Sequence, residues 1–512
     1  MFFFRLATRV SFFTFLSRIL GFVRDILIAS ILGVGFYADV FFVAFRFPNT
    51  FRRLLAEGSF NSSFIPIISN EIEKSGKKNA LIFAENILSI FFICLIFLVA
   101  IFIFFMPWLI YLIAPGFIED ANKIDTAIYF SRLTFPYLFF IIISSVYVGI
   151  LNSFNKFSFA AAQPIILNVV LVAILIVAHQ KNIMTAAWLS TGVSLAGFLQ
   201  LISLVIYTSF LGINIQPFKP AITKKVKKFF NLLIPSSLSA GVLQINILIG
   251  TVIASFQNGA VSFLYYADRI YQLPLALIGI SIATVLLPHL SKFVSQKDDL
   301  GTQNIQNRSC ELVLLFTIPA TVALIVIPTE ILTVLFQRGS FDLFATTQTA
   351  KALIAFATGL PAYSLIKILS PMFFARHNTV IPFKFALVSV VINIILSLVL
   401  FQYFGHVGIA ISTSIAAWVN LALLVFKLHK LKYLNFDKKI KSSFIKIFVI
   451  SIFMGFILAL ASKMINFFSY ELLFEKILAL SSIIFMGMIF YFCACIIVKV
   501  LNFSEIKNFS AK

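Results

Sequence analysis

The chain has 512 residues, of which 61% are hydrophobic and only 12% are charged, and its mean hydropathy is +1.03. No soluble fold of this length has enough interior to hide so many apolar side chains, so the composition excludes a soluble protein and predicts a polytopic membrane protein. The apolar runs exceed about 18 residues, which predicts helices rather than the alternating strands of a barrel.

Fourteen apolar runs follow one another, each long enough to cross a membrane as a helix. The first run is predicted to stay in the mature protein as a span and not to be cleaved as a signal peptide, because Arg18, Arg24 and Asp25 interrupt it and no small-x-small cleavage site follows. The longer loops are predicted at 67–80, 211–228, 291–308 and 428–443. The spans are predicted at about 10–33, 38–62, 81–112, 127–152, 158–179, 184–210, 229–256, 260–287, 309–336, 346–374, 381–403, 406–427, 444–466 and 474–500.

Lys and Arg are distributed unevenly between the segments that separate these spans. The termini and the even-numbered gaps carry 26 of them, whereas the odd-numbered gaps carry five. Because basic residues accumulate on the cytoplasmic side, this bias predicts a multi-pass protein with both termini in the cytoplasm. Basic loops that face an anionic inner leaflet also explain the net charge of +21, so no nucleic-acid partner is predicted.

Short matches recur along the chain at a nearly constant offset. The tripeptide Ile28-Ala29-Ser30 returns as Ile253-Ala254-Ser255, and three further pairs follow in order. These pairs are Pro136 with Pro361, Asn168 with Asn393, and Ser190-Thr191 with Ser412-Thr413. Each match alone is weak, but together they predict two homologous halves.

Six spans separate equivalent points of the two halves, so both halves have the same membrane orientation. The sequence therefore predicts an all-α polytopic fold of fourteen transmembrane helices, with two six-helix lobes related by a parallel pseudo-two-fold repeat. The predicted domains are an N-terminal lobe at 1–215, a C-terminal lobe at 216–432, and an additional helix pair with the C-terminal tail at 433–512. Transporters of this plan bind substrate at the repeat interface and work by alternating access.

Charged residues concentrate in the stretch from 17 to 69 and in the eighth span. Spans 1, 2 and 8 carry six arginines (18, 24, 46, 52, 53 and 269) and four acids (25, 39, 57 and 268), a surplus of two positive charges. Charges at membrane depth are costly unless partners or a ligand compensate them, and arginine is well suited to phosphate. The candidate substrate-binding residues are Arg18, Arg24, Arg52, Arg269, Asp25, Asp39, Arg53, Glu57 and Asp268.

A second interpretation of these charges is that they pair with one another and only hold helices together. Asp25 with Arg24 and Asp268 with Arg269 are adjacent pairs of this kind, and the acids fit this interpretation better than the surplus arginines do. Helix-breaking residues lie close by: Gly21 separates two arginines, Pro48 interrupts span 2, and Pro274 with Gly279 interrupts span 8.

Catalytic and metal-binding patterns are weak. Cys94, Cys310, Cys493 and Cys495 lie in apolar runs, and the five histidines are scattered, so no metal site, disulfide framework or cofactor is predicted. An embedded enzyme needs a metal-binding acidic cluster, for which the outer loop with Glu119, Asp120 and Asp125 is the candidate. That loop lacks a partner constellation, so the protein is predicted not to be an enzyme.

Four segments resemble the MurJ (MviN) family of lipid II flippases, within the larger group that includes multidrug and polysaccharide exporters. They are SRILGFVRD at 17–25, ADVFFVAFRFPNTFRRLLAEGSF at 38–60, YYADR at 265–269 and LLPHLSK at 286–292. The resemblance implies transport of undecaprenyl-diphosphate-linked disaccharide pentapeptide across the bacterial inner membrane for peptidoglycan synthesis. It implies that Arg18, Arg24, Arg52 and Arg269 bind the headgroup, that Asp25, Asp39 and Glu57 contribute, and that spans 13 and 14 hold the lipid tail.

The resemblance also implies partners: lipid II and membrane lipids, with cell-wall synthesis proteins as further candidates. Many relatives carry Glu where this chain has Gln272, so a carboxylate role in gating or ion coupling at that position is in doubt. The coupling ion is left open. The alternative function is a flippase or exporter for another polyprenyl-diphosphate-linked oligosaccharide or for a small-molecule drug.

Overall fold

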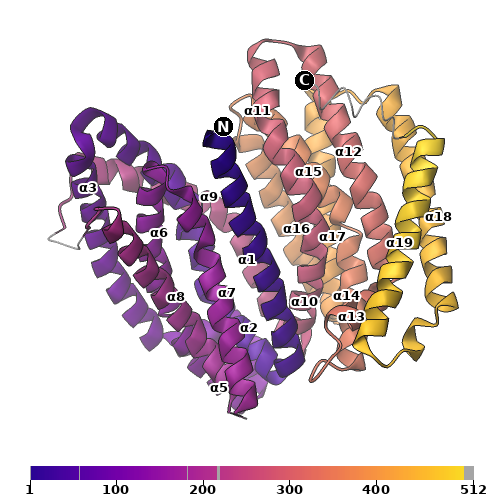
Figure 1. The fold of residues 1–512 in the computed structure, drawn as a ribbon, viewed down its shortest axis with the longest axis horizontal. Coiled ribbons are helices and arrows are strands. Elements are labelled where there is room, and N and C mark those ends of the chain that lie inside the picture. Colours follow the sequence, from indigo (N-terminus) through magenta and orange to yellow (C-terminus); the bar gives the residue numbers. More distant parts are fainter. Residues whose placement is uncertain (1, 57, 182, 216–219, 501–512) are drawn as a thin grey trace. The chain divides into compact units, whose positions relative to one another are not determined.

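The computed structural model describes residues 2–56, 58–181, 183–215 and 220–500. Every regular element in these ranges is a helix (Figure 1). Among the described residues, eleven continuous helical stretches, several of which join two or three of the helices named below, are long and apolar enough to cross a membrane. These features confirm an α-helical, multi-pass membrane protein, whereas the count of fourteen spans and the symmetry of the lobes stay predictions.

The chain divides into two units, the first of which comprises residues 1–262 and 339–341. Within this unit α7 packs along α1 and α8, and α9 packs along α3. Phe229 of α9 contributes to the second contact, because its ring meets those of Phe60 and Phe64 at 5.6 and 6.0 Å. The helices are α1 (Phe2–Leu32), α2 (Phe36–Phe51), η1 (Arg52–Ala56), α3 (Ser59–Phe104), α4 (Met106–Ile113), η2 (Pro115–Glu119), α5 (Ala121–Thr134), α6 (Tyr137–Ser153), α7 (Phe157–Gln180), α8 (Thr185–Phe210), α9 (Lys224–Ala254) and the start of α10 (Ala260–Pro274).

The second unit comprises residues 263–338 and 342–512. In it α16 packs along α17, and α12 packs along α18. The predicted domain boundaries after 215 and 432 stay predictions. The helices, after the rest of α10, are η3 (Leu275–Ile280), α11 (Ser281–Ser295), α12 (Asp299–Val326), α13 (Pro328–Leu335), α14 (Leu343–Ala357), α15 (Leu360–Phe374), α16 (Val380–Phe404), α17 (His406–Lys430), α18 (Lys438–Met464), η4 (Phe467–Ser469) and α19 (Leu473–Ile497).

Side-chain caps explain where several helices begin. Asp120, Asp298, Asp342 and Asp437 each accept a backbone N–H of the first turn, at the starts of α5, α12, α14 and α18. Thr223 does the same for α9. Carboxylate and hydroxyl oxygens satisfy amide groups that have no partner inside the helix, so these residues set the helix starts locally.

Two predicted loops contain a break between helices, as expected, but the break is much shorter than predicted. In 67–80 two helical segments of α3 meet at a kink at Gly76, where φ is +77°, and the rest is helical. Residues 291–308 are largely helical, because α11 continues to Ser295 and α12 begins at Asp299. The polar residues in these segments are compatible with helix; they lower the hydropathy without ending the helix.

Prolines divide several predicted spans. The spans predicted at 81–112, 127–152, 309–336 and 346–374 each contain two helices that meet close to a proline. Pro48 and Pro274 are each followed by a π-helix, η1 and η3, which confirms the predicted interruptions of spans 2 and 8. Gly21 does not interrupt its span, because α1 is continuous from Phe2 to Leu32.

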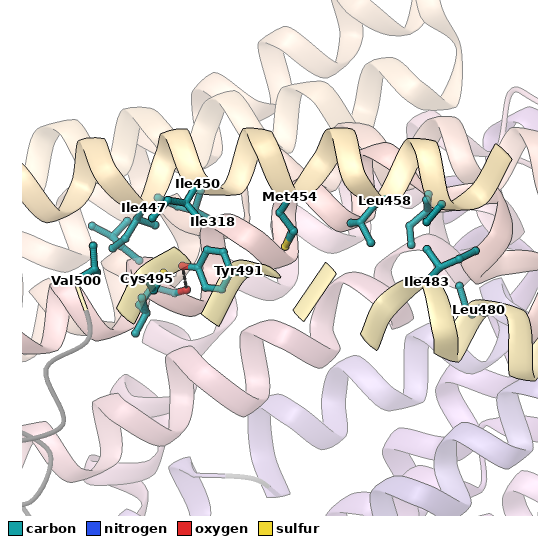
Figure 2. Close-up of a cluster of buried hydrophobic side chains, with 14 of the residues drawn as sticks. Ile318, Ile447, Ile450, Met454, Leu458, Leu480, Ile483, Tyr491, Cys495 and Val500 are labelled. Carbon is teal, nitrogen blue, oxygen red and sulfur yellow. Dashed lines mark hydrogen bonds between the residues drawn. The ribbon is translucent and has the colours of Figure 1, made fainter. Parts of the chain in front are cut away.

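The last two helices pack on α12 around a common apolar cluster (Figure 2). Met454 and Leu458 of α18 and Ile483 of α19 are buried in it, and the hydroxyl of Tyr491 donates to the carbonyl of Leu315 at 2.6 Å. Serines hold both ends of α18: Ser443 donates to Glu311, and Ser462 donates to Glu330. The additional helix pair is therefore firmly joined to the second unit. Beside the cluster lies an apolar groove of about 230 Å³, lined by residues of α12, α18 and α19.

Candidate functional site

Arg24 and Asp25 form an ion pair on α1, the helix that contains the first predicted span. The Arg24 side chain donates from Nε and Nη2 to Oδ1 of Asp25 at 3.1 and 2.7 Å. Arg24 is 7% exposed and Asp25 is 2% exposed. A charge buried in a membrane helix is tolerated when it is paired and hydrogen-bonded, and this pairing satisfies that requirement for both residues.

A neutral side chain from another helix completes this cluster. Asn168 of α7 accepts a hydrogen bond from Nη1 of Arg24 at 3.0 Å and donates from Nδ2 to the carbonyl of Ser17 at 2.9 Å. Gly21 leaves room for this amide, because a Cβ atom there would lie 3.4 Å from its nitrogen. The sequence identified Asn168 only as a repeated position; an amide within an apolar span was the available signal for a polar contact.

Asp39 is completely buried and binds the beginning of α10. Its carboxylate accepts from the backbone N–H groups of Gly259 and Ser262 at 2.8 and 3.0 Å, and from the Ser262 hydroxyl at 2.6 Å. A carboxylate at a helix N-terminus is favoured both by these donors and by the helix dipole. Asp39 therefore holds the first turn of α10, while its predicted contact with substrate stays a prediction.

Lys123, which the sequence did not single out, neutralises Asp39. Its Nζ atom lies 3.1 Å from Oδ2 of Asp39 and 2.9 Å from Oδ1 of Asn258, and it lies 4.5 Å from the centre of the Phe117 ring. Lys123 is 6% exposed. Nothing in the sequence indicated this contact, because Asp39 and Asn258 are distant in the chain and Phe117 lies on another helix.

The end of α2 carries the next group of basic residues. Arg46, Arg52 and Arg53 are half-buried, and Nε of Arg52 donates to Oδ1 of Asn49 at 3.0 Å. Arg52 and Arg53 lie on the π-helix η1, a distortion that is frequent at functional sites. Arg18 is exposed on α1. The predicted site residue Glu57 lies outside the described residues.

Asp268 and Arg269 lie in the second unit, half-buried on α10. The guanidinium of Arg269 donates from Nη2 to the hydroxyl of Tyr265 at 2.9 Å and lies 4.6 Å from the centre of that ring. The carboxylate of Asp268 accepts a hydrogen bond from Gln272, the residue that replaces the glutamate of many relatives. Both contacts span one helical turn, so α10 itself presents an oriented arginine beside a hydrogen-bonded acid.

Two further contacts join distant segments in the first unit. The amide of Gly116 donates to the Ser255 hydroxyl at 3.0 Å, and the amide of Ser340 donates to the Ser30 carbonyl at 2.8 Å. Both serines end the repeated Ile-Ala-Ser tripeptide. Among the side chains that the structure describes, no three His, Cys, Asp or Glu residues gather as metal ligands would.

The fold and these buried charges together define a class: an α-helical membrane transporter with arginines inside its spans. The model of the family lipid II flippase MurJ matches residues 28–479. A Rickettsia prowazekii protein described as "Probable lipid II flippase MurJ" is 38% identical over 503 residues, which cover 98% of this chain and 99% of that protein. A Rhizobium tropici protein with the same description is 41% identical over 443 residues, covering 86% and 83% of the two chains.

Solved structures agree. A structure described as lipid II flippase MurJ in an inward closed conformation has a TM-score of 0.81 at 28% identity, over 96% of this chain and 98% of that chain. A MATE multidrug transporter of the MOP superfamily has a TM-score of 0.65 at 15% identity over 81% and 95% of the chains, which shows a shared fold alone. The chain belongs to the MurJ family of lipid II flippases.

Proposed function

We propose that this protein moves lipid II, the undecaprenyl-diphosphate-linked peptidoglycan precursor, from the inner to the outer leaflet of the bacterial cytoplasmic membrane. Membership of the MurJ family supports this substrate, because relatives that match nearly the whole chain are described as lipid II flippases. The protein acts as a transporter and not as an enzyme. The observation that carries the proposal is the arginine buried in the first span, Arg24, held by one carboxylate and one amide.

The chemistry of the charged residues fits this substrate. Spans 1, 2 and 8 have two more arginines than acids, and the diphosphate of lipid II carries about two negative charges. Guanidinium groups stay charged when they are desolvated and bind phosphate through two hydrogen bonds at once. In this proposal Arg18, Arg24, Arg52 and Arg269 bind the headgroup. The acids Asp25, Asp39, Glu57 and Asp268 and the arginine at 53 complete the site.

The proposed architecture has fourteen spans in two six-helix lobes, 1–215 and 216–432, related by a parallel repeat, with both termini in the cytoplasm. The helix pair after residue 432 accommodates the lipid tail. Alternating access carries the headgroup across while no cofactor takes part. Because an anionic substrate moves outward, an inside-negative potential assists by about 2.3 kcal/mol per charge per 100 mV.

Complementation of a cell depleted of its own lipid II flippase tests the proposal. The wild-type chain is expected to restore growth, whereas Arg24→Ala and Arg269→Ala are expected to accumulate in the membrane without restoring it. Normal growth with both variants would discard the anion-site assignment. Failure of the accumulated wild-type chain would favour another polyprenyl-diphosphate-linked oligosaccharide or a drug as substrate.

A further inference from the structure

We propose that Asn168 is a positioning residue for Arg24: its amide holds the guanidinium group in the orientation in which it binds the phosphates of the substrate. The inference rests on the proposed function, because it assumes that Arg24 contacts an anionic headgroup. It adds to the candidate site a residue of the fifth predicted span, in which none of the candidate charged residues lies.

The position of Asn168 calls for a specific partner. It lies near the middle of α7, a 24-residue helix that is apolar enough to cross a membrane, and it is 5% exposed. An amide buried in such surroundings costs free energy unless both of its polar atoms are hydrogen-bonded. Both atoms have partners here, and both partners belong to α1.

Three residues of α1 form the surface that receives this amide. Ser17, Gly21 and Arg24 are spaced by four and three positions, so they share one face of the helix. The small residues at 17 and 21 let α7 approach closely, as small-xxx-small pairs do in membrane helices. The amide thus spans from the carbonyl of Ser17 to the guanidinium of Arg24, about two turns along α1.

The two contacts determine which way the amide points. Its NH₂ group meets a carbonyl and its oxygen meets a guanidinium; the reverse orientation would face donor with donor and acceptor with acceptor. Arg24 is therefore held on one side by Asp25, through Nε and Nη2, and on the other by Asn168, through Nη1. A guanidinium fixed on two sides loses less freedom when it binds an anion, so binding is tighter.

A neutral amide orients Arg24 without cancelling its charge. Asp25 already balances one positive charge, so a second carboxylate at position 168 would give the guanidinium two anionic neighbours and repel a diphosphate. Asn168→Asp therefore keeps an acceptor that orients Arg24 while it adds a negative charge beside the guanidinium. The carboxylate keeps the acceptor for Nη1 and pairs with Arg24, but it loses the NH₂ donor to the Ser17 carbonyl. The expected effects are a lower unfolding midpoint than that of the parent protein and weaker anion binding.

The experiment measures binding of lipid II to the purified full-length protein in detergent micelles, together with the midpoint of thermal unfolding. The variants are Asn168→Ala, Asn168→Asp, Arg24→Ala and the double variant Arg24→Ala/Asn168→Ala. The matched control is Gln163→Ala, which removes another buried amide of α7 that contacts Phe159 and Ser203. This control is expected to lower the unfolding midpoint without changing the affinity.

We expect Asn168→Ala to weaken binding about fivefold and Asn168→Asp about thirtyfold, with the Asp variant unfolding at no lower temperature than the Ala variant. In the Arg24→Ala background, removal of Asn168 is expected to change the affinity by less than about twofold, because the residue acts only through Arg24. If Asn168→Ala does not yield folded protein, the lipid II affinity of Asn168→Asp decides whether Asn168 positions Arg24.

Two failures are distinguishable. Unchanged affinity in Arg24→Ala would overturn the proposed anion site itself. If Arg24→Ala weakens binding but the Asn168 variants do not, the positioning role is overturned and the proposed function stays intact. The same conclusion follows if Asn168→Ala weakens binding as much in the Arg24→Ala background as it does in the parent protein.

Discussion

Replacing Asp39 by Asn tests how the beginning of α10 is held. Both carboxylate oxygens accept hydrogen bonds, one from Gly259 and the other from Ser262, so Asn keeps one acceptor, places an NH₂ donor where the other was, and removes the charge. Lys123 then loses its buried anionic partner at 3.1 Å but keeps the Asn258 oxygen at 2.9 Å and the face of the Phe117 ring. Breaking a buried ion pair costs about 3–5 kcal/mol, and the expected loss lies in this range because the contacts that Lys123 keeps are offset by the acceptor that position 39 loses.

Two further variants divide this loss. Asp39→Ala also removes the cap and is expected to cost about 0.5–2 kcal/mol more than Asp39→Asn. Lys123→Met is expected to cost less than Asp39→Asn, because the carboxylate keeps its donors at Gly259 and Ser262. The double variant Asp39→Asn/Lys123→Met should cost less than the sum of the single variants, because it leaves no unpaired charge.

The assay is unfolding of the purified protein in mixed micelles, followed by tryptophan fluorescence. The matched control is Asp298→Asn at the start of α12, where an exposed carboxylate caps Gly301. That control is expected to stay within about 0.5 kcal/mol of the parent, because Asn also caps well. An equally small effect of Asp39→Asn, or a larger loss for Lys123→Met, would refute the reasoning.

Two other positions give sharp expectations. Gly339→Ala should lower the unfolding midpoint, because φ is +56° and a Cβ atom would lie 2.3 Å from the Ser30 carbonyl oxygen. The control is Gly212→Ala, where φ is +68° but the space around a Cβ atom is open, and it should lower the midpoint less. Tyr265→Phe should weaken lipid II binding about fivefold, because it removes the hydroxyl that accepts from Arg269. Tyr265→Leu should weaken binding further, because it also removes the ring beside the guanidinium. Equal affinities in the parent protein and both variants would contradict a role of Tyr265 in orienting Arg269.

Local chemistry made much of the fold predictable. Long apolar runs indicated the membrane helices, and proline, which has no backbone N–H and fixes its own φ, indicated where helices are interrupted, as at Pro48 and Pro274. The adjacent pair Arg24 and Asp25 also followed from the sequence, because neighbouring residues need no tertiary information to meet.

Contacts between distant segments were not predictable in this way. Lys123 meets Asp39 across 84 positions, and Asn168 meets Arg24 across 144. Neither pairing leaves a local pattern, because each depends on which helices pack together. The loops predicted at 67–80 and 291–308 are too long for a different reason. Hydropathy marks where a segment becomes polar, whereas the helices are interrupted only at Gly76 and between Ser295 and Asp299.

The repeated Ile-Ala-Ser tripeptide is a local sequence pattern that also takes part in contacts between distant segments. In each copy the serine lies beside a glycine from a distant segment: Ser30 beside Gly339, and Ser255 beside Gly116. A Cβ atom on either glycine would lie within 2.4 Å of a serine carbonyl oxygen, so only glycine allows the backbones to approach this closely. Each copy also accepts a hydrogen bond from a backbone N–H group at this point: the Ser30 carbonyl accepts from Ser340, and the Ser255 hydroxyl accepts from Gly116. Duplication of an ancestral half would account both for the repeated tripeptide and for the glycine beside each serine, while the two-lobe architecture itself stays a prediction.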